Sequence, residues 1–311
     1  MGNSDLIKSY NFQTYKEGPN VLIIAGVHGD EYEPILVAIK LINELSGLLK
    51  SGSVTIVPLT NESAYYGSNR CAEDGLDMAR ICPGKPQGSI TERTASQISV
   101  LINKADYFID MHTGGLAYDI YPLAGYMLHP NTEILKKQQE MAQAFNLPLV
   151  WGTDYRPEGR TLSVARDAKV PAIYLEYGGG TGIRNKVIQE YKAGVMNILS
   201  YLNMLKVPIN NQVAKDKYWI EDSRQDSGYL QGKMPSPVDG IFIAEVKIGD
   251  MIKAGELFGG VIESLTGERV DLHADIDGLV FLLRTLVKVK PGDALGGIMP
   301  IGSLNERVIY E

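Results

Sequence analysis

The stretch Val21–Pro34, VLIIAGVHGDEYEP, decides how the rest of the chain is interpreted. Its apolar start is rich in β-forming residues and ends at a glycine, whereas the residues from Tyr32 onward follow helical spacing. His28 and Glu31 are therefore expected on the loop between a strand and a helix, where open α/β sheets keep their sites. A spacing of three places an imidazole and a carboxylate within reach of one cation. Taken alone, however, His-x-x-Glu is more often a surface pair at a helix start.

Two later apolar strands carry further side chains of this kind. The strand YFID is followed by His112 and two glycines, so we expect this histidine at the same end of the sheet as His28. Glu176 lies inside the apolar strand PAIYLEY, where a buried carboxylate without a partner would be costly. His28, Glu31 and His112 form the ligand set of a catalytic zinc, and Glu176 is the natural general base for water. Asp110 either orients the His112 imidazole or is a strand-end turn residue.

Strand and helix patterns alternate through the first two thirds of the chain, which predicts an α/β fold with parallel βαβ units. The expected strands are residues 21–25, 54–59, 107–110, 147–151 and 171–177, and the expected helices are 35–49, 89–105, 131–145, 160–169 and 185–205. Residues 61–87 form a long connection that carries Arg70 and Arg80, whose guanidinium groups can hold a carboxylate or polarise a carbonyl. Such long connections are functional or disordered, and the apolar residues beside Arg80 favour function.

A change in composition marks the expected domain boundary at residues 206–227, which contain a proline and a run of polar residues. Short β-rich runs follow, and they contain an internal repeat: VDGIF and KAGELFGGV are matched by IDGLV and KPGDALGGI. We therefore expect two domains, residues 1–206 and residues 207–311. The second is expected to be a small, all-β, pseudo-symmetric sandwich.

Composition excludes several classes of function. The 30 basic and 37 acidic residues give a net charge of −7, which argues against a nucleic-acid or anionic-membrane partner. No apolar run approaches the roughly 18 residues that a membrane span needs, and the N-terminus lacks the pattern of a signal peptide, so a cytoplasmic protein is expected. Cys71 and Cys82 provide no disulfide framework and are expected to be buried or incidental thiols.

Four pieces of the chain, GVHGDEYEP, DGLDMARICPG, DMHTGG and AIYLEYGGG, resemble the succinylglutamate desuccinylase and aspartoacylase family, relatives of the zinc carboxypeptidases. The resemblance covers residues 21–205 and implies a mixed sheet flanked by helices. It implies a hydrolase with one zinc ion per chain, which cleaves the amide bond of an N-acylated amino acid or related small amine. In this family pattern His28, Glu31 and His112 hold the zinc, and Glu176 deprotonates water and passes the proton to the leaving amine.

The resemblance also implies roles for three arginines. Arg70 matches the arginine that steadies the substrate carbonyl as it becomes an oxyanion. Arg80 matches the second residue of an Asn-Arg pair that clasps the α-carboxylate of the amino acid, but Ala79 stands in the asparagine position. The loss of that hydrogen bond leaves the amino-acid specificity open. Arg160 lies near a further substrate-binding arginine of the family, and a homo-oligomer is a further expectation from the resemblance.

The C-terminal part resembles the lipoyl or biotinyl carrier sandwich through SPVDGIF and KIGDMIKAGELFGGVIES. Such carriers hold their cofactor on a lysine in the next hairpin turn, but here Leu265, Thr266 and Gly267 follow. This part is therefore expected to cover the mouth of the active site or to mediate assembly. Two alternatives to a deacylase stay open: a zinc carboxypeptidase that acts on short peptides, and a non-catalytic module whose carrier-like domain binds partners.

Overall fold

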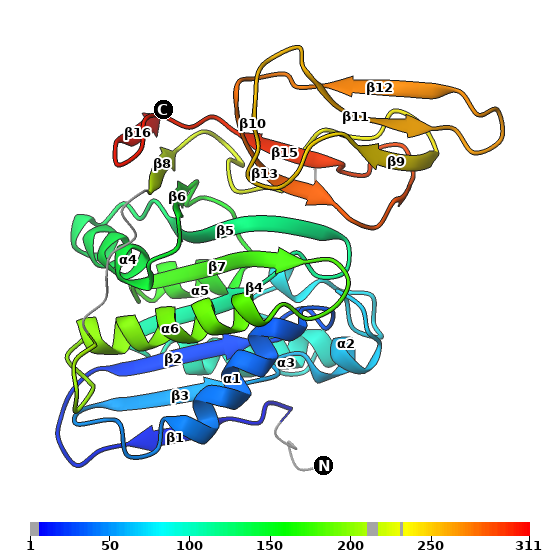
Figure 1. Ribbon diagram of the computed structural model, residues 1–311. Coiled ribbons are helices and arrows are strands. Elements are labelled where there is room, and N and C mark those ends of the chain that lie inside the picture. The colour runs from blue at the N-terminus through cyan, green and yellow to red at the C-terminus, as the bar shows by residue number, and fades with distance from the viewer. Residues whose placement is uncertain (1–5, 210–216, 231–232) are drawn as a thin grey trace.

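The computed structural model describes residues 6–209, 217–230 and 233–311, and the expected mixed α/β fold is confirmed (Figure 1). A large sheet runs through the molecule, with helices on both faces and a smaller antiparallel sheet formed by C-terminal residues. The strands of the main path follow the order β1 (Tyr10–Gln13), β3 (Ser53–Val57), β2 (Asn20–Ala25), β4 (Tyr107–His112), β7 (Ala172–Gly179), β5 (Tyr118–Met127), β6 (Leu149–Thr153), β8 (Tyr218–Asp222) and β16 (Arg307–Tyr310).

The helices cover the two faces of the large sheet unequally. One face is covered by α1 (Tyr32–Glu44), α4 (Thr132–Phe145) and α6 (Asn185–Tyr201), and the other by α3 (Ile90–Ile102) and α5 (Thr161–Asp167). Successive strand residues point to opposite faces, so Ile23 of β2 packs with the first group and Ile24 with the second. The long connection holds two short helices, α2 (Glu62–Tyr66) and η1 (Met78–Arg80).

Local sequence signals set the starts of α3 and α4. A capping box is present at the start of α3, where Ser89 and Glu92 exchange side-chain and backbone hydrogen bonds. Asn131 caps α4, and its side chain accepts hydrogen bonds from two backbone N–H groups. The expected end of the first helix was wrong, since α1 ends at Glu44. Leu45 and Leu49 are nevertheless buried in the same core, so their helical spacing reflected burial of the turn that follows the helix.

The longest strand of the large sheet, β5, was not predicted from the sequence. It runs from Tyr118 to Met127 and contains Pro122, which lies in an irregularity between the paired residues Ile120 and Leu123. A proline inside a pattern argues against a central strand, and here the bulge accommodates it. The first part of β5 pairs with β7 and with β13 (Gly278–Arg284), and the second part pairs with β7 and β6. The sheet therefore branches at β5.

The C-terminal repeat is confirmed by its pairing. In the first copy β9 (Gly240–Ala244) pairs with β11 (Leu257–Ile262), and in the second β13 pairs with β15 (Gly296–Met299). The short strand of each copy pairs with a strand of the other copy. β14 (Lys288–Val289) of the second copy pairs with β9, and β10 (Met251–Ile252) of the first copy pairs with β13. β12 (Arg269–His273) completes the four-stranded sheet beside β11. The exchange gives the two copies a shared core, which includes Phe242 and Val280.

The division of the chain at residue 206 stays a prediction. β8 and β16 come after it in the sequence, yet both extend the large sheet. β13 also pairs directly with β5, so the C-terminal strands lie against the large sheet (Figure 1).

Cys71 and Cys82 are free thiols, and Cys82 is buried. Within the described ranges, no helix has the length and apolar character that a membrane span requires.

Candidate functional site

The candidate site lies at the carboxyl ends of three neighbouring parallel strands. β2, β4 and β7 are adjacent and parallel, so their ends meet at one edge of the sheet. His112 is the last residue of β4 and stands opposite Glu176 of β7 in the pairing register. The loop from β2 to α1 brings His28 and Glu31 to the same edge. The structure therefore unites the four predicted residues, which are far apart in the chain.

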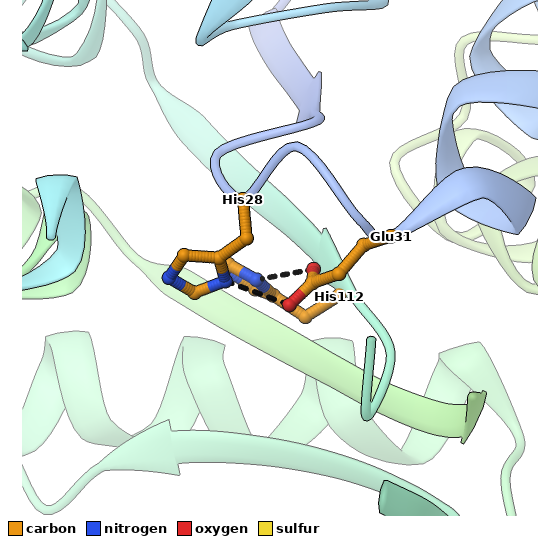
Figure 2. A group of neighbouring side chains, drawn as sticks. All are labelled: His28, Glu31 and His112. Carbon is orange, nitrogen blue, oxygen red and sulfur yellow. Dashed lines mark hydrogen bonds and ion pairs between the residues drawn. The ribbon is translucent and has the colours of Figure 1, made fainter. Parts of the chain in front are cut away.

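Three of these side chains converge on one another (Figure 2). His28 Nδ1 lies 2.7 Å from Glu31 Oε1, and His112 Nδ1 lies 2.9 Å from Glu31 Oε2. The two imidazole rings are 5.1 Å apart between centroids, and one donor atom from each residue lies within 4.8 Å of the others. All three residues are buried. Two imidazole nitrogens and a carboxylate within this distance could hold a single metal ion.

Each imidazole also has a second carboxylate beside its other ring nitrogen. His112 Nε2 lies 3.0 Å from Asp110 Oδ1, and His28 Nε2 lies 3.3 Å from Asp77 Oδ1. Asp110 in turn accepts a 2.5 Å hydrogen bond from the Thr161 hydroxyl. Histidines that bind metals commonly give their other ring N–H to a carboxylate, which fixes the ring and raises its basicity. This arrangement favours the orienting role over the turn role for Asp110.

Asp77 is a site residue that sequence reasoning did not single out. Besides contacting His28, it accepts a 2.9 Å hydrogen bond from Arg70 Nε and another from the Ala79 backbone N–H. Asp77 therefore connects the loop that carries His28 to the segment that carries Arg70 and Arg80. Its position three residues before Arg80 was visible in the sequence, but nothing there indicated that the segment folds back onto the histidine.

The charges of the cluster favour an ionised Glu31. Burial would raise the pKa of Glu31, but the neighbouring charges of His28 and His112 outweigh it and hold the pKa well below its ordinary value. Burial lowers the pKa of His112, and the Asp110 and Glu31 charges more than reverse this, so its pKa is raised well above the ordinary value. The negative charges of Glu31 and Asp110 favour a positive charge between them, and a divalent cation would supply one. The donor set therefore fits a metal ion.

Glu176 faces the same space without a direct partner. Its Oε2 atom is buried and accepts no hydrogen bond from the described residues. Burial raises the pKa of Glu176 to about 8, with the nearby His112 charge opposing the shift and the Glu31 charge adding to it. A carboxyl group that titrates near neutral pH can both accept and donate a proton, as a general base and acid must.

All seven residues predicted from the sequence line one cavity of about 210 Å³: His28, Glu31, Arg70, Arg80, His112, Arg160 and Glu176. Arg70 Nη1 is 3.4 Å from His28 Nδ1, so it borders the metal-ligand cluster. The Arg80 guanidinium lies 5.9 Å from the centre of the Tyr229 ring, and Arg160 stands at the start of α5. Ala79 also lines the cavity, beside Arg80.

The individual residues of the remaining wall were not identified from the sequence. It includes Tyr118 and Ile120 from β5, together with Leu230 and Leu282 from the region after residue 206. These are ordinary apolar or aromatic strand and loop residues without a motif, and only the pairing of β13 with β5 brings Leu282 to the site. His129, in contrast, is buried away from the cavity and accepts a hydrogen bond from the Asn131 backbone, as expected for a core histidine.

Comparison with known proteins gives consistent matches. The family profile of the succinylglutamate desuccinylase/aspartoacylase catalytic domain matches residues 17–202. The N-alpha-acetyl-L-2,4-diaminobutyric acid deacetylase of Halomonas elongata is 29% identical over 292 residues, covering 92% of this chain and 83% of that protein. A succinylglutamate desuccinylase/aspartoacylase from Rhodobacter sphaeroides has a similar fold (TM-score 0.84, 24% identity, 95% and 90% of the two chains). So does the product-bound ectoine utilization protein EutE (DoeB) from Ruegeria pomeroyi (TM-score 0.83, 24% identity, 93% and 87%).

Proposed function

Because the chain belongs to the succinylglutamate desuccinylase/aspartoacylase family, we propose that it is a zinc-dependent deacylase that hydrolyses the amide bond of an N-acylated amino acid or related small amine. The observation that supports this most is the buried cluster of His28, Glu31 and His112, with the unpartnered Glu176 carboxyl group in the same cavity. A metal-ligand set, a titratable carboxyl group and arginines around one small cavity are the components that amide hydrolysis needs.

His28, Glu31 and His112 would hold the zinc ion, and Asp77 and Asp110 would orient the two imidazoles. When bound there, zinc supplies a Lewis acid that makes water more acidic and polarises a carbonyl group. Zinc is preferred over calcium or magnesium because imidazole nitrogens are poor ligands for those hard cations.

Glu176 carries the proton through the reaction. Its carboxylate takes a proton from the attacking water, and its carboxylic acid then gives that proton to the nitrogen that leaves. Burial, which raises its pKa, allows one group to perform both transfers near neutral pH. The Oε2 atom without a hydrogen-bond partner among the described residues is available to the reacting atoms.

The arginines position the substrate and stabilise charge. Arg70 is fixed by the hydrogen bond from its Nε to Asp77, which leaves its Nη groups near the His28 end of the cavity to stabilise the oxyanion that forms at the carbonyl. Arg80 and Arg160 supply positive charge to the α-carboxylate. Because Ala79 offers no side-chain amide there, the α-carboxylate of the substrate is held with one hydrogen bond fewer than an asparagine would allow.

The apolar wall favours a small substrate over a peptide. Leu230 and Leu282 line the cavity, which has a volume of about 210 Å³. This space suits an N-acyl amino acid better than an extended chain. The name of the Halomonas elongata relative, a deacetylase of N-alpha-acetyl-L-2,4-diaminobutyric acid, supports the acetyl group as the first acyl group to test.

The test combines metal analysis with a substrate panel. We expect about one zinc per chain by elemental analysis, and turnover of at least one N-acetyl or N-succinyl amino acid but not of short unmodified peptides. Glu176→Gln should lower kcat by about 10²–10⁴-fold, the usual contribution of a general acid-base group. Glu133→Gln, on the outer helix α4, is the matched control and should retain full activity. Absence of zinc, or full turnover by Glu176→Gln, would contradict the proposal.

A further inference from the structure

Tyr118 and Arg284 form a pair at the point where the sheet branches. Tyr118 is the first residue of β5 and lines the cavity, and Arg284 is the last residue of β13. The two residues stand directly opposite each other in the antiparallel register between these strands. The adjacent Thr285 extends the contact, since its backbone N–H donates to the Ala117 carbonyl over 2.8 Å. A residue from the C-terminal region therefore lies directly behind a cavity side chain.

Arg284 is a rigid support. Its side chain is only 8% exposed. Its Nε donates to the Leu286 carbonyl over 2.8 Å, its Nη2 donates to Asp293 over 3.1 Å, and its Nη1 contacts the Ala294 carbonyl at 3.3 Å. The same Nη1 lies 3.1 Å from the Tyr118 hydroxyl, and the guanidinium carbon lies 5.6 Å from the Tyr118 ring centre. These contacts fix both the guanidinium and the phenol that it touches.

The direction of the hydrogen bond between the two residues is forced. A guanidinium group can only donate hydrogen bonds, so the Tyr118 oxygen accepts from Arg284. The hydroxyl proton of Tyr118 is therefore left for another acceptor, and the part of the chain that the structure describes offers none. An O–H group whose oxygen accepts from a cation is a stronger donor than an isolated phenol.

The surroundings of Tyr118 select the acceptor. Burial and the Asp293 charge raise the pKa of Tyr118, and the Arg284 and Arg70 charges oppose this shift without reversing it, so the hydroxyl group keeps its proton near neutral pH. Because the guanidinium group of Arg284 touches the phenol oxygen, an oxygen that is negative or partly negative is the preferred acceptor for the Tyr118 proton. The apolar side chain of Leu282 lines the same part of the wall.

We propose that Tyr118 is a substrate-binding residue that donates a hydrogen bond to a carboxylate or acyl oxygen of the substrate, and that Arg284 is its positioning residue. The substrate pocket is then completed by the region after residue 206, which does more than cover the opening. This inference rests on the proposed function for the class of substrate, an N-acyl amino acid, and on the observed contacts for the role of each residue.

The experiment compares four proteins with their metal retained: wild type, Tyr118→Phe, Arg284→Met and the double variant. Tyr118→Phe keeps the ring and removes the hydroxyl, so kcat/KM for the best N-acetyl amino acid should fall about tenfold or more, as for the loss of a hydrogen bond to a charged group. Arg284→Met should cause a similar loss in the wild-type background and a much smaller one in the Tyr118→Phe background, because the two changes remove the same interaction.

Two controls separate this role from a structural one. Tyr121→Phe removes a half-buried phenol from the same strand outside the cavity and should leave kcat/KM unchanged. Arg284→Lys keeps a donor and should retain part of the activity that Arg284→Met loses. Thermal unfolding of each variant reports on folding, and a lower Tm with unchanged kcat/KM would show that the pair is only structural and would overturn the inference.

Ligand binding distinguishes this inference from the proposed function. Calorimetric titration of N-acetyl amino acids into Glu176→Gln proteins, with and without Tyr118→Phe, measures the contact without turnover. Weaker binding after Tyr118→Phe supports the inference even if the wild type hydrolyses nothing, an outcome that would defeat only the proposed function. Turnover by the wild type with equal binding and equal kcat/KM in Tyr118→Phe would overturn only the inference. Neither binding nor turnover of any panel member would overturn both.

Discussion

The two walls of the cavity are built in different ways. The wall of proposed metal ligands comes from the ends of three adjacent parallel strands, and its members carry ionisable groups in recognisable short motifs. The second wall comes from the start of β5 and from residues after 206, and it includes Tyr118, Ile120, Leu230 and Leu282. In the proposed function, the first wall cleaves the bond and the second wall selects the substrate. A change in one wall should therefore affect reaction steps that a change in the other leaves alone.

The largest expected effect is on the ligand wall. His28→Ala or His112→Ala removes one of the three proposed metal ligands, so we expect the loss of stoichiometric zinc and a fall of turnover to the background rate. Elemental analysis and steady-state kinetics measure both quantities. The control is His129→Ala, which removes a buried histidine outside the cavity. Equal zinc content in His112→Ala and His129→Ala would show that His112 is not a zinc ligand.

The carboxylates behind the two histidines should have the next largest effect. Asp110→Asn and Asp77→Asn each weaken the orientation of one imidazole, which commonly costs about 10–100-fold in metal affinity. We expect the greater loss for Asp110, because it is completely buried and lies closer to its histidine, at 3.0 Å against 3.3 Å for Asp77. Zinc affinity measured by competition with a chelator ranks the two. The opposite ranking would show that the Asp77 link to Arg70 matters more than burial.

A change in the second wall should affect substrate selection. Leu282→Ala enlarges the cavity, so KM for the best substrate should rise roughly tenfold while kcat and zinc content stay near the wild-type values. Val280→Ala is the matched control, because Val280 lies two residues away in β13 and packs into the core of the C-terminal sheets. Both variants lose stability, by about 1–5 kcal/mol for such truncations, but only Leu282→Ala should change KM. A large fall in kcat for Leu282→Ala would contradict the expectation that this wall affects substrate binding and not bond cleavage.

The smallest effect on turnover is expected from the last test, which concerns the pH dependence of stability in the metal-free protein. The pKa of Glu176 is raised from an ordinary 4.5 to about 8, so its contribution to stability is fully present below pH 4.5 and is lost as the pH rises towards 8. The free energy of unfolding of the wild type should therefore fall relative to that of Glu176→Gln over this range. Urea unfolding in the presence of a chelator at about pH 5, 6.5 and 8 measures the difference. Parallel pH profiles for the two proteins would show that the Glu176 carboxyl group is not perturbed.

Much of the first wall could be predicted because its signals are local. An apolar run that ends in glycine and histidine identifies a strand end, and adjacent parallel strands place such ends together. The helix caps at Ser89 and Asn131 are local in the same sense, since each depends on a side chain that bonds to the next turn. The end of α1 was not predictable from spacing, because Leu45 is buried by a turn that continues the same core.

What the sequence determined by itself is the set of reactive groups and the strands that carry them: His28, Glu31, His112 and Glu176, with the arginines of the connecting loops. Only the tertiary structure decided how the site is supported and enclosed. Asp77 reaches His28 because the connection folds back, and Tyr118 meets Arg284 because β5 accepts β13 as a partner beside the irregularity at Pro122. The physical reason is that such contacts join residues separated by tens to more than a hundred positions, and their energy depends on burial and pairing that no local pattern encodes.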